Sequence, residues 1–498
     1  MHHRFVGRSL TALLLTLLLA PGALAQYLEE KVREHTLANG LKLLTVERHD
    51  SPTFAAYITI GVGGVDETSQ TRGVAHLLEH MLFKGTKTLG TVDFRKEKPL
   101  LQEIEEVGVA LDTLREARDA DPQEVSRLKD RLEALQKRHK EFVVKDEFSR
   151  IYAKNGGVGY NAFTSKDLTT YLVSLPANKF ELWAAVESDR MKNPVLREFY
   201  TEREVITEER RRSYESSPGG MLYETLIANA FTVHPYRNPT IGWPSDIVNL
   251  SLAETRDFLH SYYAPVNTVI AIVGDIDTEE AVATVERNFG DIPPGTPVPP
   301  VVAVEPEQKG EKRVKVEFDA EPRLAVAFHK PTLPERDDYV FDLIDLILAG
   351  GRTSRLYRAL VVEQQLATSV STYGAPGSRF PNLFVFSLVP RYPHTPGEVE
   401  RALYAELQRL ASEPVTPREL ERARNRLRTD RLRYLKGNTG LARMLTYYQT
   451  VAKDWRYLVD YDEVVAGIGA DEVMAAARTY FTPANRTVVT LAKKGQQP

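Results

Sequence analysis

One segment of the 498-residue chain is repeated, and this repeat limits the folds that the chain can adopt. Residues 262–267 read YYAPVN and are followed by Val269 and Ile270, while residues 480–485 read YFTPAN and are followed by Thr487 and Val488. Each copy predicts a helix end, a Pro-Asn turn and a strand at the same offset. The repeat is too long for a solenoid, so we expect two similar domains.

The Pro-rich stretch 293–306 predicts the linker between these domains. The first domain is then 26–292 and the second 307–498, in an α+β chain. Predicted strands cover 41–46 and 55–62 in the first domain, and 314–318 and 324–328 in the second. A helix over about 339–349 follows the second pair of strands.

A charged helical stretch from about 94 to 154 interrupts the first domain. Two apolar stripes at helical spacing predict an antiparallel helical hairpin, and Asp121 and Pro122 predict the N-cap and first position of its second helix. The stripes are Leu100, Ile104, Val107 and Leu111, then Leu128, Leu132, Leu135 and Phe142. We expect this insertion to serve structure or contact with a partner.

The sequence HLLEH at 76–80 contains the chemistry of a metal site. Apolar neighbours at helical spacing predict a short helix, for which Gly85 is a candidate C-cap. On one helix, His76, His80 and Glu79 point to nearly the same side. Neutral imidazoles suit zinc, and a nearby carboxylate can take a proton from an activated water molecule. The spacing is that of the inverted zinc-peptidase signature, and a third protein ligand is still required.

An acidic helix beginning near Glu198 offers several candidates for that third ligand. Glu202 and Glu209 are two turns apart and share a face, whereas Glu204 and Glu208 point elsewhere. Spacing does not choose among them. Separately, the glycine-rich block 156–164 precedes a β-branched stretch at 169–175, and its strand edge could pair with an extended peptide or be purely structural.

The N-terminus predicts export. A basic start, an apolar run from Leu10 to Leu19 and the small-x-small sequence at 23–25 indicate a cleavable signal peptide over 1–25. The apolar run is too short to span a bilayer, so no integral membrane segment is expected after cleavage. The absence of cysteine excludes disulfides and fits the periplasm, and the net charge of −4 argues against nucleic acid as a partner.

With these pieces together, the chain resembles the pitrilysin/insulinase family of zinc peptidases, in its two-domain form related to mitochondrial processing peptidase. The resemblance runs from about Thr36 to the C-terminus, apart from the insertion. It rests on HLLEH, on Asn161 and Ala162 before Thr164, and on the segments 234–236 (HPY) and 350–356 (GGRTSRL). The implied fold is two α/β sandwiches, each a mainly antiparallel sheet with helices packed on one face.

The resemblance also implies roles for individual residues. The third ligand of the family is the last glutamate of a Glu-x6-Glu pair, which is Glu209 here, and Glu202 is the supporting acidic residue of the active centre. One Zn²⁺ per chain is then held by His76, His80 and Glu209, with Glu79 as general base. The strand with Asn161 and Ala162 is implied to bind the backbone of an unfolded peptide inside a closed chamber. Only the first domain can hold the metal, because the helix at 339–349 has no histidine.

One departure from the family affects the expected partner. An arginine and a tyrosine seven residues apart complete the cleft in these enzymes, and Val361 and Thr368 stand at the matching positions here. Neither side chain can donate as those groups do. We therefore expect a heterodimer with a homologous subunit that carries the Arg/Tyr pair, with a homodimer as the alternative. Rival functions are a non-catalytic assembly subunit and a peptide-binding chaperone of the same fold.

Overall fold

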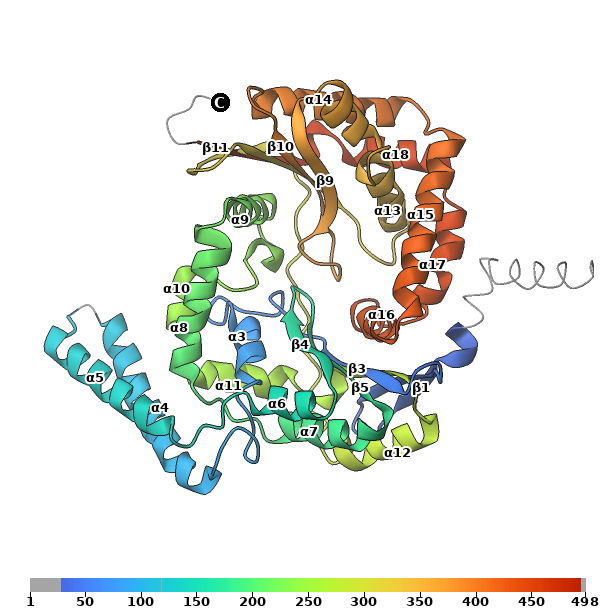
Figure 1. The fold of residues 1–498 in the computed structure, drawn as a ribbon. Helices are drawn as coiled ribbons and strands as arrows, with labels where there is room; N and C mark the ends of the chain where they lie inside the picture. Colours follow the sequence, from blue (N-terminus) through green and yellow to red (C-terminus); the bar gives the residue numbers. More distant parts are fainter. Residues whose placement is uncertain (1–27, 118, 494–498) are drawn as a thin grey trace, which may run out of the picture. The chain divides into compact units, whose positions relative to one another are not determined.

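The computed structural model describes residues 28–117 and 119–493 (Figure 1). The expected signal peptide lies outside the described residues. The chain divides into two compact units. The first is His35–Leu43 with Arg48–Glu305, and the second is mainly the chain from Pro306 onwards, joined by Leu44–Glu47 and the described residues up to Glu34. Residues 293–306 form neither helix nor strand.

A six-stranded sheet organises the first half of the chain. Its order is β1-β2-β6-β3-β5-β4. The central strand β3 pairs antiparallel with both neighbours, so that Ile58 lies opposite Tyr171 on one side and Ile270 on the other. The strands are β1 (Arg33–Thr36), β2 (Lys42–Glu47), β3 (Thr53–Ile60), β4 (Val158–Thr164), β5 (Thr169–Pro176) and β6 (Thr268–Gly274).

Ten helices of the described chain accompany this sheet. An aromatic cluster anchors α7 to β3, because Trp183 stacks on Phe180 with ring centroids 5.4 Å apart and contacts Phe54 edge-on at 6.4 Å. The helices are α3 (Val74–Met81), α4 (Phe94–Glu116), α5 (Pro122–His139), α6 (Glu147–Lys154), α7 (Phe180–Lys192), α8 (Phe199–Arg210), α9 (Pro218–Ala230), α10 (Pro244–Asn249), α11 (Leu252–Tyr262) and α12 (Thr278–Phe289).

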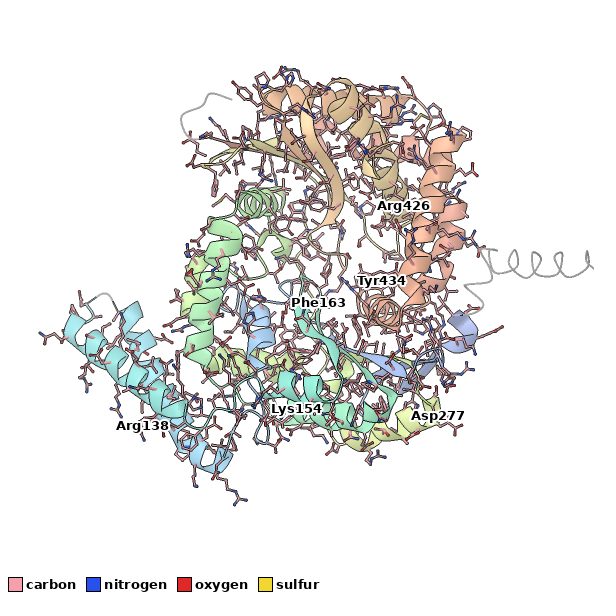
Figure 2. All side chains as sticks on the ribbon, in the orientation of Figure 1. Arg138, Lys154, Phe163, Asp277, Arg426 and Tyr434 are labelled. Atoms are coloured by element: carbon pink, nitrogen blue, oxygen red, sulfur yellow. The ribbon has the colours of Figure 1, made fainter. Side chains whose placement is uncertain are left out.

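The helical hairpin predicted from the two apolar stripes is confirmed as α4 and α5. Asp121 caps α5 by accepting a hydrogen bond from the Gln123 amide, with Pro122 at the first position as expected. At the base of the hairpin, the buried Glu97 of α4 pairs with His139 of α5 at 2.8 Å and with Arg197 at 2.6 Å. This buried triad ties both helices to the segment that leads into α8. Figure 2 labels Arg138 at the same end of α5.

A five-stranded sheet organises the second half, in the order β7-β11-β8-β10-β9. Only β7 and β11 pair in parallel, and β8 pairs antiparallel with β10 and β11. The strands are β7 (Lys312–Glu317), β8 (Arg323–Lys330), β9 (Ala367–Ala375), β10 (Asn382–Pro390) and β11 (Arg486–Ala492). The helices are α13 (Arg336–Ala349), α14 (Pro396–Ser412), α15 (Pro417–Lys436), α16 (Asn438–Val451), α17 (Tyr457–Ala466) and α18 (Ala470–Tyr480).

The two sheets share one topology, as the repeat predicts. Reading β7-β11-β8-β10-β9 against β2-β6-β3-β5-β4 matches strand for strand. The repeated Pro-Asn turns at 265–267 and 483–485 lead into the matching strands β6 and β11. In the same way α13 follows β8 as α3 follows β3, so α13 is the counterpart of the helix that carries HLLEH. The predicted α+β fold of two similar domains is confirmed.

Among the described residues, no helix combines the length and the apolar character that crossing a membrane requires.

Candidate metal centre

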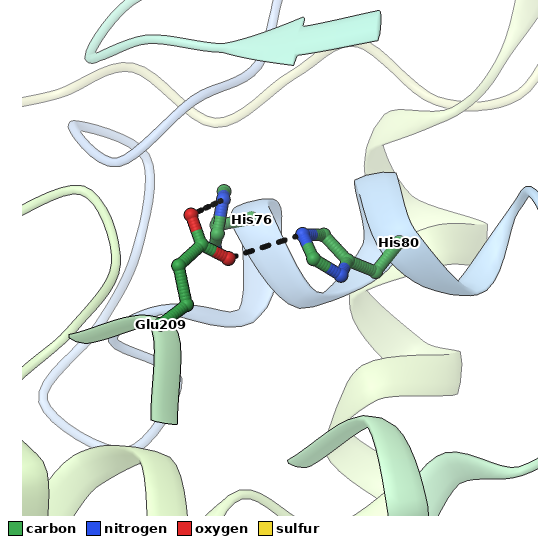
Figure 3. Close-up of side chains that lie close together, drawn as sticks. All are labelled: His76, His80 and Glu209. Atoms are coloured by element: carbon green, nitrogen blue, oxygen red, sulfur yellow. Dashed lines mark ion pairs between the residues drawn. The ribbon is translucent and has the colours of Figure 1, made fainter. Parts of the chain in front are cut away.

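Two helices bring three candidate ligands together. His76 and His80 lie one turn apart on α3 with ring centroids 4.9 Å apart, and α8 presents Glu209 to both (Figure 3). The Nε2 atom of His76 is 3.7 Å from Glu209 Oε1, and the Nε2 atom of His80 is 3.5 Å from Glu209 Oε2. Among the described residues, these are the three His, Asp or Glu side chains that lie close enough together to share a metal ion.

The geometry and charge of these side chains fit zinc. Zinc bonds of about 2.0–2.2 Å in a tetrahedron place neighbouring ligand atoms about 3.3–3.6 Å apart, close to the 3.5 and 3.7 Å between the histidine nitrogens and Glu209. Burial, and then the neighbouring His80, lower the pKa of His76 to about 3. His76 is therefore neutral at ordinary pH, which is the form that binds a metal. Its Nδ1 atom is buried without a hydrogen-bond partner.

Glu202 supports the opposite side of His80. Its Oε2 atom lies 3.4 Å from His80 Nδ1, while Lys84 pairs with Oε1 at 2.5 Å. Burial lowers the pKa of His80, but the hydrogen bond to Glu202 and the nearby carboxylates outweigh burial and raise it. Burial likewise raises the pKa of Glu202, and the bonds from His80 and Lys84 outweigh it and lower this pKa. An ionised Glu202 is thus placed to orient the imidazole of His80.

Glu79 lies beside the two histidines, and a residue of the sheet fixes its position by a hydrogen bond. The Thr164 hydroxyl, at the end of β4, donates a hydrogen bond of 2.6 Å to Glu79 Oε2. Burial raises the pKa of Glu79, although the bond from Thr164 and the charge of His80 act against it. A carboxylate with a raised pKa holds a proton more firmly, as a general base requires.

Asn161 and Ala162 lie on β4, the edge strand of the six-stranded sheet. They pair with Leu172 and Tyr171 of β5, and the register shifts between Val158 and Asn161. Asn161 is exposed and Ala162 is buried. Figure 2 labels Phe163 of the same strand. Since β4 ends the strand order, its outer edge is placed to pair with an added strand.

One supporting residue of α3 was not predicted from the sequence, and the predicted role of Gly85 was wrong. The Glu67 carboxylate accepts hydrogen bonds from the Gly73 and Ala75 amides, at 2.9 and 3.0 Å, and so holds the first turn of α3. Burial raises the pKa of Glu67 and lowers that of its neighbour Lys166. Gly85 is not the C-cap, because α3 ends at Met81. Gly85 has a φ of +114° and a Cβ there would lie 2.3 Å from the Leu89 carbonyl oxygen, so it serves a tight turn instead.

Two other residues that support the metal centre, Thr164 and Lys84, were only partly indicated by the sequence. Thr164 belongs to the Asn161–Thr164 motif, and Lys84 lies just beyond HLLEH. Glu67 lies too far before α3 for the usual N-cap spacing to indicate it.

Two models of known protein families match most of the chain. The family model described as "Insulinase (Peptidase family M16)" matches residues 42–119 and 123–243. The model described as "Peptidase M16 inactive domain" matches residues 249–427. The gap between the two parts of the first match, residues 120–122, lies at the tip of the helical hairpin.

Similar proteins and structures agree with these matches. "Zinc protease PqqE" of Helicobacter pylori is 25% identical over 92% of this chain and 91% of its own length. "Probable mitochondrial-processing peptidase subunit beta, mitochondrial" of Arabidopsis thaliana is 24% identical over 84% of this chain and 71% of its own.

Two solved structures share the fold. A protease from Helicobacter pylori superposes with a TM-score of 0.78 at 24% identity, covering 93% of this chain and 99% of its own. The periplasmic protease PqqL from Escherichia coli superposes with a TM-score of 0.67 at 17% identity, covering 93% of this chain and 48% of its own. The chain belongs to the insulinase family of peptidases, peptidase family M16.

Proposed function

We propose that this protein is a zinc metalloendopeptidase. The observation that carries the proposal is the convergence of His76, His80 and Glu209 with Glu79 beside them. Several relatives are named zinc proteases, which supports the same activity. Zinc would be held by His76, His80 and Glu209, one ion per chain.

When bound, zinc supplies Lewis-acid chemistry: it makes a water molecule easier to deprotonate and polarises a carbonyl group. Glu79 acts as general base. Its Oε2 atom is occupied by the hydroxyl of Thr164, so Oε1 is the atom that takes the proton and later returns it to the leaving amine. Glu202 keeps Nδ1 of His80 engaged, so that Nε2 faces Glu209.

The proposed substrate is an unfolded peptide that adds as a strand to the outer edge of β4, near Asn161 and Ala162. Backbone pairing of this kind reads no particular side chain, and a folded protein cannot present such a strand. A closed chamber around this edge would strengthen the selection. The proposed location is the periplasm, which the predicted signal peptide supports; one structural neighbour is a periplasmic protease.

The proposed assembly is a heterodimer with a homologous subunit. Val361 is buried in the segment Tyr357–Glu363, and Thr368 lies exposed on β9, where the family sequence has arginine and tyrosine. Neither provides the missing donors. One relative is named as the beta subunit of a processing peptidase, which supports a two-chain arrangement. A homodimer is the alternative assembly.

The alternative functions are a non-catalytic assembly subunit and a peptide-binding chaperone. The match to a model described as an inactive domain is the observation that keeps them open. That match covers 249–427 and so excludes all four residues of the metal centre.

The test is cleavage of an unstructured peptide pool by the zinc-loaded protein. Glu79→Gln should retain zinc and lose cleavage by about 100-fold or more, because an amide cannot accept the proton. Glu204→Gln, an exposed glutamate on the same helix as Glu209, is the matched control and should cleave normally. Equal cleavage by Glu79→Gln and the native protein would remove Glu79 as the base. Zinc binding with no cleavage by any form would favour the partner or the non-catalytic alternatives.

A further inference from the structure

The second unit has a cavity at the position that corresponds to the metal centre of the first. It has a volume of about 350 Å³ and lies beside α13, β9 and β10, the counterparts of α3, β4 and β5. A carboxylate on each helix accepts a hydrogen bond from a threonine on the matching strand. The pairs are Glu79 with Thr164 in the first half and Asp345 with Thr372 in the second.

Three aspartates of α13 face this cavity. Asp338, Asp342 and Asp345 occur at positions i, i+4 and i+7, which places them on one side of the helix. Lys330 pairs with Asp338 and neutralises it. Within the described chain, Asp342 and Asp345 accept hydrogen bonds from hydroxyl groups: Tyr461 donates to Asp342 at 2.5 Å, and Thr372 donates to Asp345.

An amide supplies an independent sign that the cavity is built for a donor. Asn382 lines it and is only 3% exposed. Its Nδ2 atom donates to the Gly377 carbonyl, which fixes the orientation of the amide, and its Oδ1 atom is buried without a hydrogen-bond partner. A buried acceptor left unsatisfied costs about 1–3 kcal/mol. A bound group that donates hydrogen bonds would satisfy Asn382 and both aspartates.

The chemistry of the lining selects an organic cation over a metal ion. In the part of the chain that the structure describes, the three aspartates do not approach one another closely enough to share a metal, unlike His76, His80 and Glu209 in the first unit. Aromatic rings surround the carboxylates, including Tyr447, Tyr448 and Tyr461. The Lys330 ammonium already packs 5.5 Å from the Phe341 ring centroid, so a cation is tolerated against these rings.

We propose that this cavity binds the guanidinium or ammonium group of an organic cation, such as an arginine side chain. A planar guanidinium has five donors spread over several ångströms and stacks on aromatic rings, so it can reach separate acceptors that a small ion cannot bridge. The volume falls in the range of about 300–1,000 Å³ typical of small-ligand sites. Binding of such a cation would require neither the metal centre nor catalysis.

The raised pKa of Asp342 agrees with a carboxyl group that a bound cation would help to ionise. Burial, and then Asp338, raise the pKa of Asp342 to about 7, against the bond from Tyr461 and the charge of Lys330. Cation binding favours the ionised carboxylate and should therefore strengthen as pH rises through about 7. The titratable groups that face Asp342 are Lys330, Asp338, Asp345, Tyr339, Tyr448 and Tyr461.

The test is calorimetric titration with arginine amide, using the whole protein with Glu79→Gln so that no peptidase activity interferes. Citrulline amide is the matched ligand, because it has the same shape without the charge. We expect saturable 1:1 binding of arginine amide, and binding of citrulline amide weaker by about tenfold or more. Equal affinity for the two ligands, or no saturation by arginine amide, would overturn the proposal.

Variants locate the binding. Asp342→Asn and Asp345→Asn keep the hydrogen bonds from Tyr461 and Thr372 but lose the charge, so each should weaken arginine amide binding by about tenfold. Asp319→Asn, an exposed aspartate of the same unit, should bind as before. Unchanged affinity in both cavity variants would place the binding elsewhere and reject the site.

Two further ligands distinguish the source of the cation. Agmatine represents free small amines, and the blocked tripeptide acetyl-Ala-Arg-Ala-amide represents an arginine within a peptide. Binding of the tripeptide at least as tight as that of agmatine assigns the site to peptide side chains. Binding of agmatine without the tripeptide assigns the site to free amines. In either case, Asp345→Asn should weaken the binding of whichever ligand binds, because both carry the guanidinium group.

Discussion

The helices α3 and α13 occupy the same position in two sheets of the same topology, yet they present different chemistry. On α3, His76, Glu79 and His80 crowd onto one turn and meet Glu209 from α8. On α13, the polar positions are aspartates spread over two turns, and aromatic side chains line the same cavity. The comparison shows that one framework supports either a tight group of ligands or a wider, acceptor-lined cavity.

The difference arises from spacing as well as residue type. Residues at i, i+3 and i+4 converge on one point, whereas residues at i, i+4 and i+7 form a line along the helix. A metal needs ligand atoms within one coordination sphere, which only the first arrangement gives. The hydroxyl bonds from Thr164 and Thr372 to a helix carboxylate are the features that both sites retain.

Among substitutions in the two sites, Glu209→Gln should have the largest effect, on zinc affinity at the first site. An amide is a far poorer zinc ligand than a carboxylate, and the two histidines alone leave the ion two protein ligands. We expect zinc affinity to fall by at least about 100-fold, beyond the range typical of supporting residues. Competition with a chelator measures this. Glu204→Gln serves as control on the same helix, and native affinity in Glu209→Gln would move the third ligand elsewhere.

In the other site, Asp342→Asn should change how stability depends on pH. The ordinary pKa of aspartate is about 3.8 and that of folded Asp342 is about 7, so between these values the folded state holds a proton that the unfolded state has lost. The native protein therefore loses stability as pH rises from about 4 to 7, on the order of 2–4 kcal/mol. The asparagine variant lacks this loss.

Urea unfolding of the ligand-free proteins at pH 4 to 8 tests this expectation. The stability of Asp342→Asn relative to the native protein should rise across the interval, while Asp319→Asn should follow the native curve. A constant difference between Asp342→Asn and the native protein would mean that Asp342 titrates normally.

How far the sequence predicts these sites depends on how local each contact is. The periodicity of the strands, the hairpin and the repeat are local or self-similar patterns, and they gave the fold. The convergence of His76 and His80 follows from helical spacing alone. Spacing could not separate Glu202 from Glu209, because they share a face; only the approach of α8 to α3 places one at Nδ1 and the other at Nε2 of His80.

Local sequence patterns could not predict the contacts between segments that are distant in the chain. The bonds from Thr164 to Glu79 and from Thr372 to Asp345 join strands to helices that lie far apart in the chain. Their existence depends on the register of the sheets, which no local pattern of the sequence determines. The cavity beside α13 was missed for the same reason, because Asn382 and Tyr461 reach it from separate elements.

Glu202→Gln should have an intermediate effect on the first site. The variant keeps a side chain of the same size beside His80 Nδ1 but removes the charge that also pairs with Lys84. Supporting residues of this kind contribute about 10- to 100-fold to metal affinity, so a loss within that range is expected in the chelator competition. A loss equal to that of Glu209→Gln would make Glu202 a ligand rather than a support.

The smallest effect should come from Glu67→Gln, which tests how firmly α3 itself is held. Its carboxylate caps the amides of Gly73 and Ala75 and faces Lys166 in a buried setting. Glutamine has one carbonyl oxygen where the carboxyl group has two acceptor oxygens, so one of the two amides loses its partner and we expect a loss of about 1–2 kcal/mol in unfolding free energy. Zinc affinity should fall by less than in Glu202→Gln, because the ligands remain and only the first turn of α3 loosens. An undiminished stability would show that the first turn of α3 is held by its packing rather than by the hydrogen bonds to Glu67.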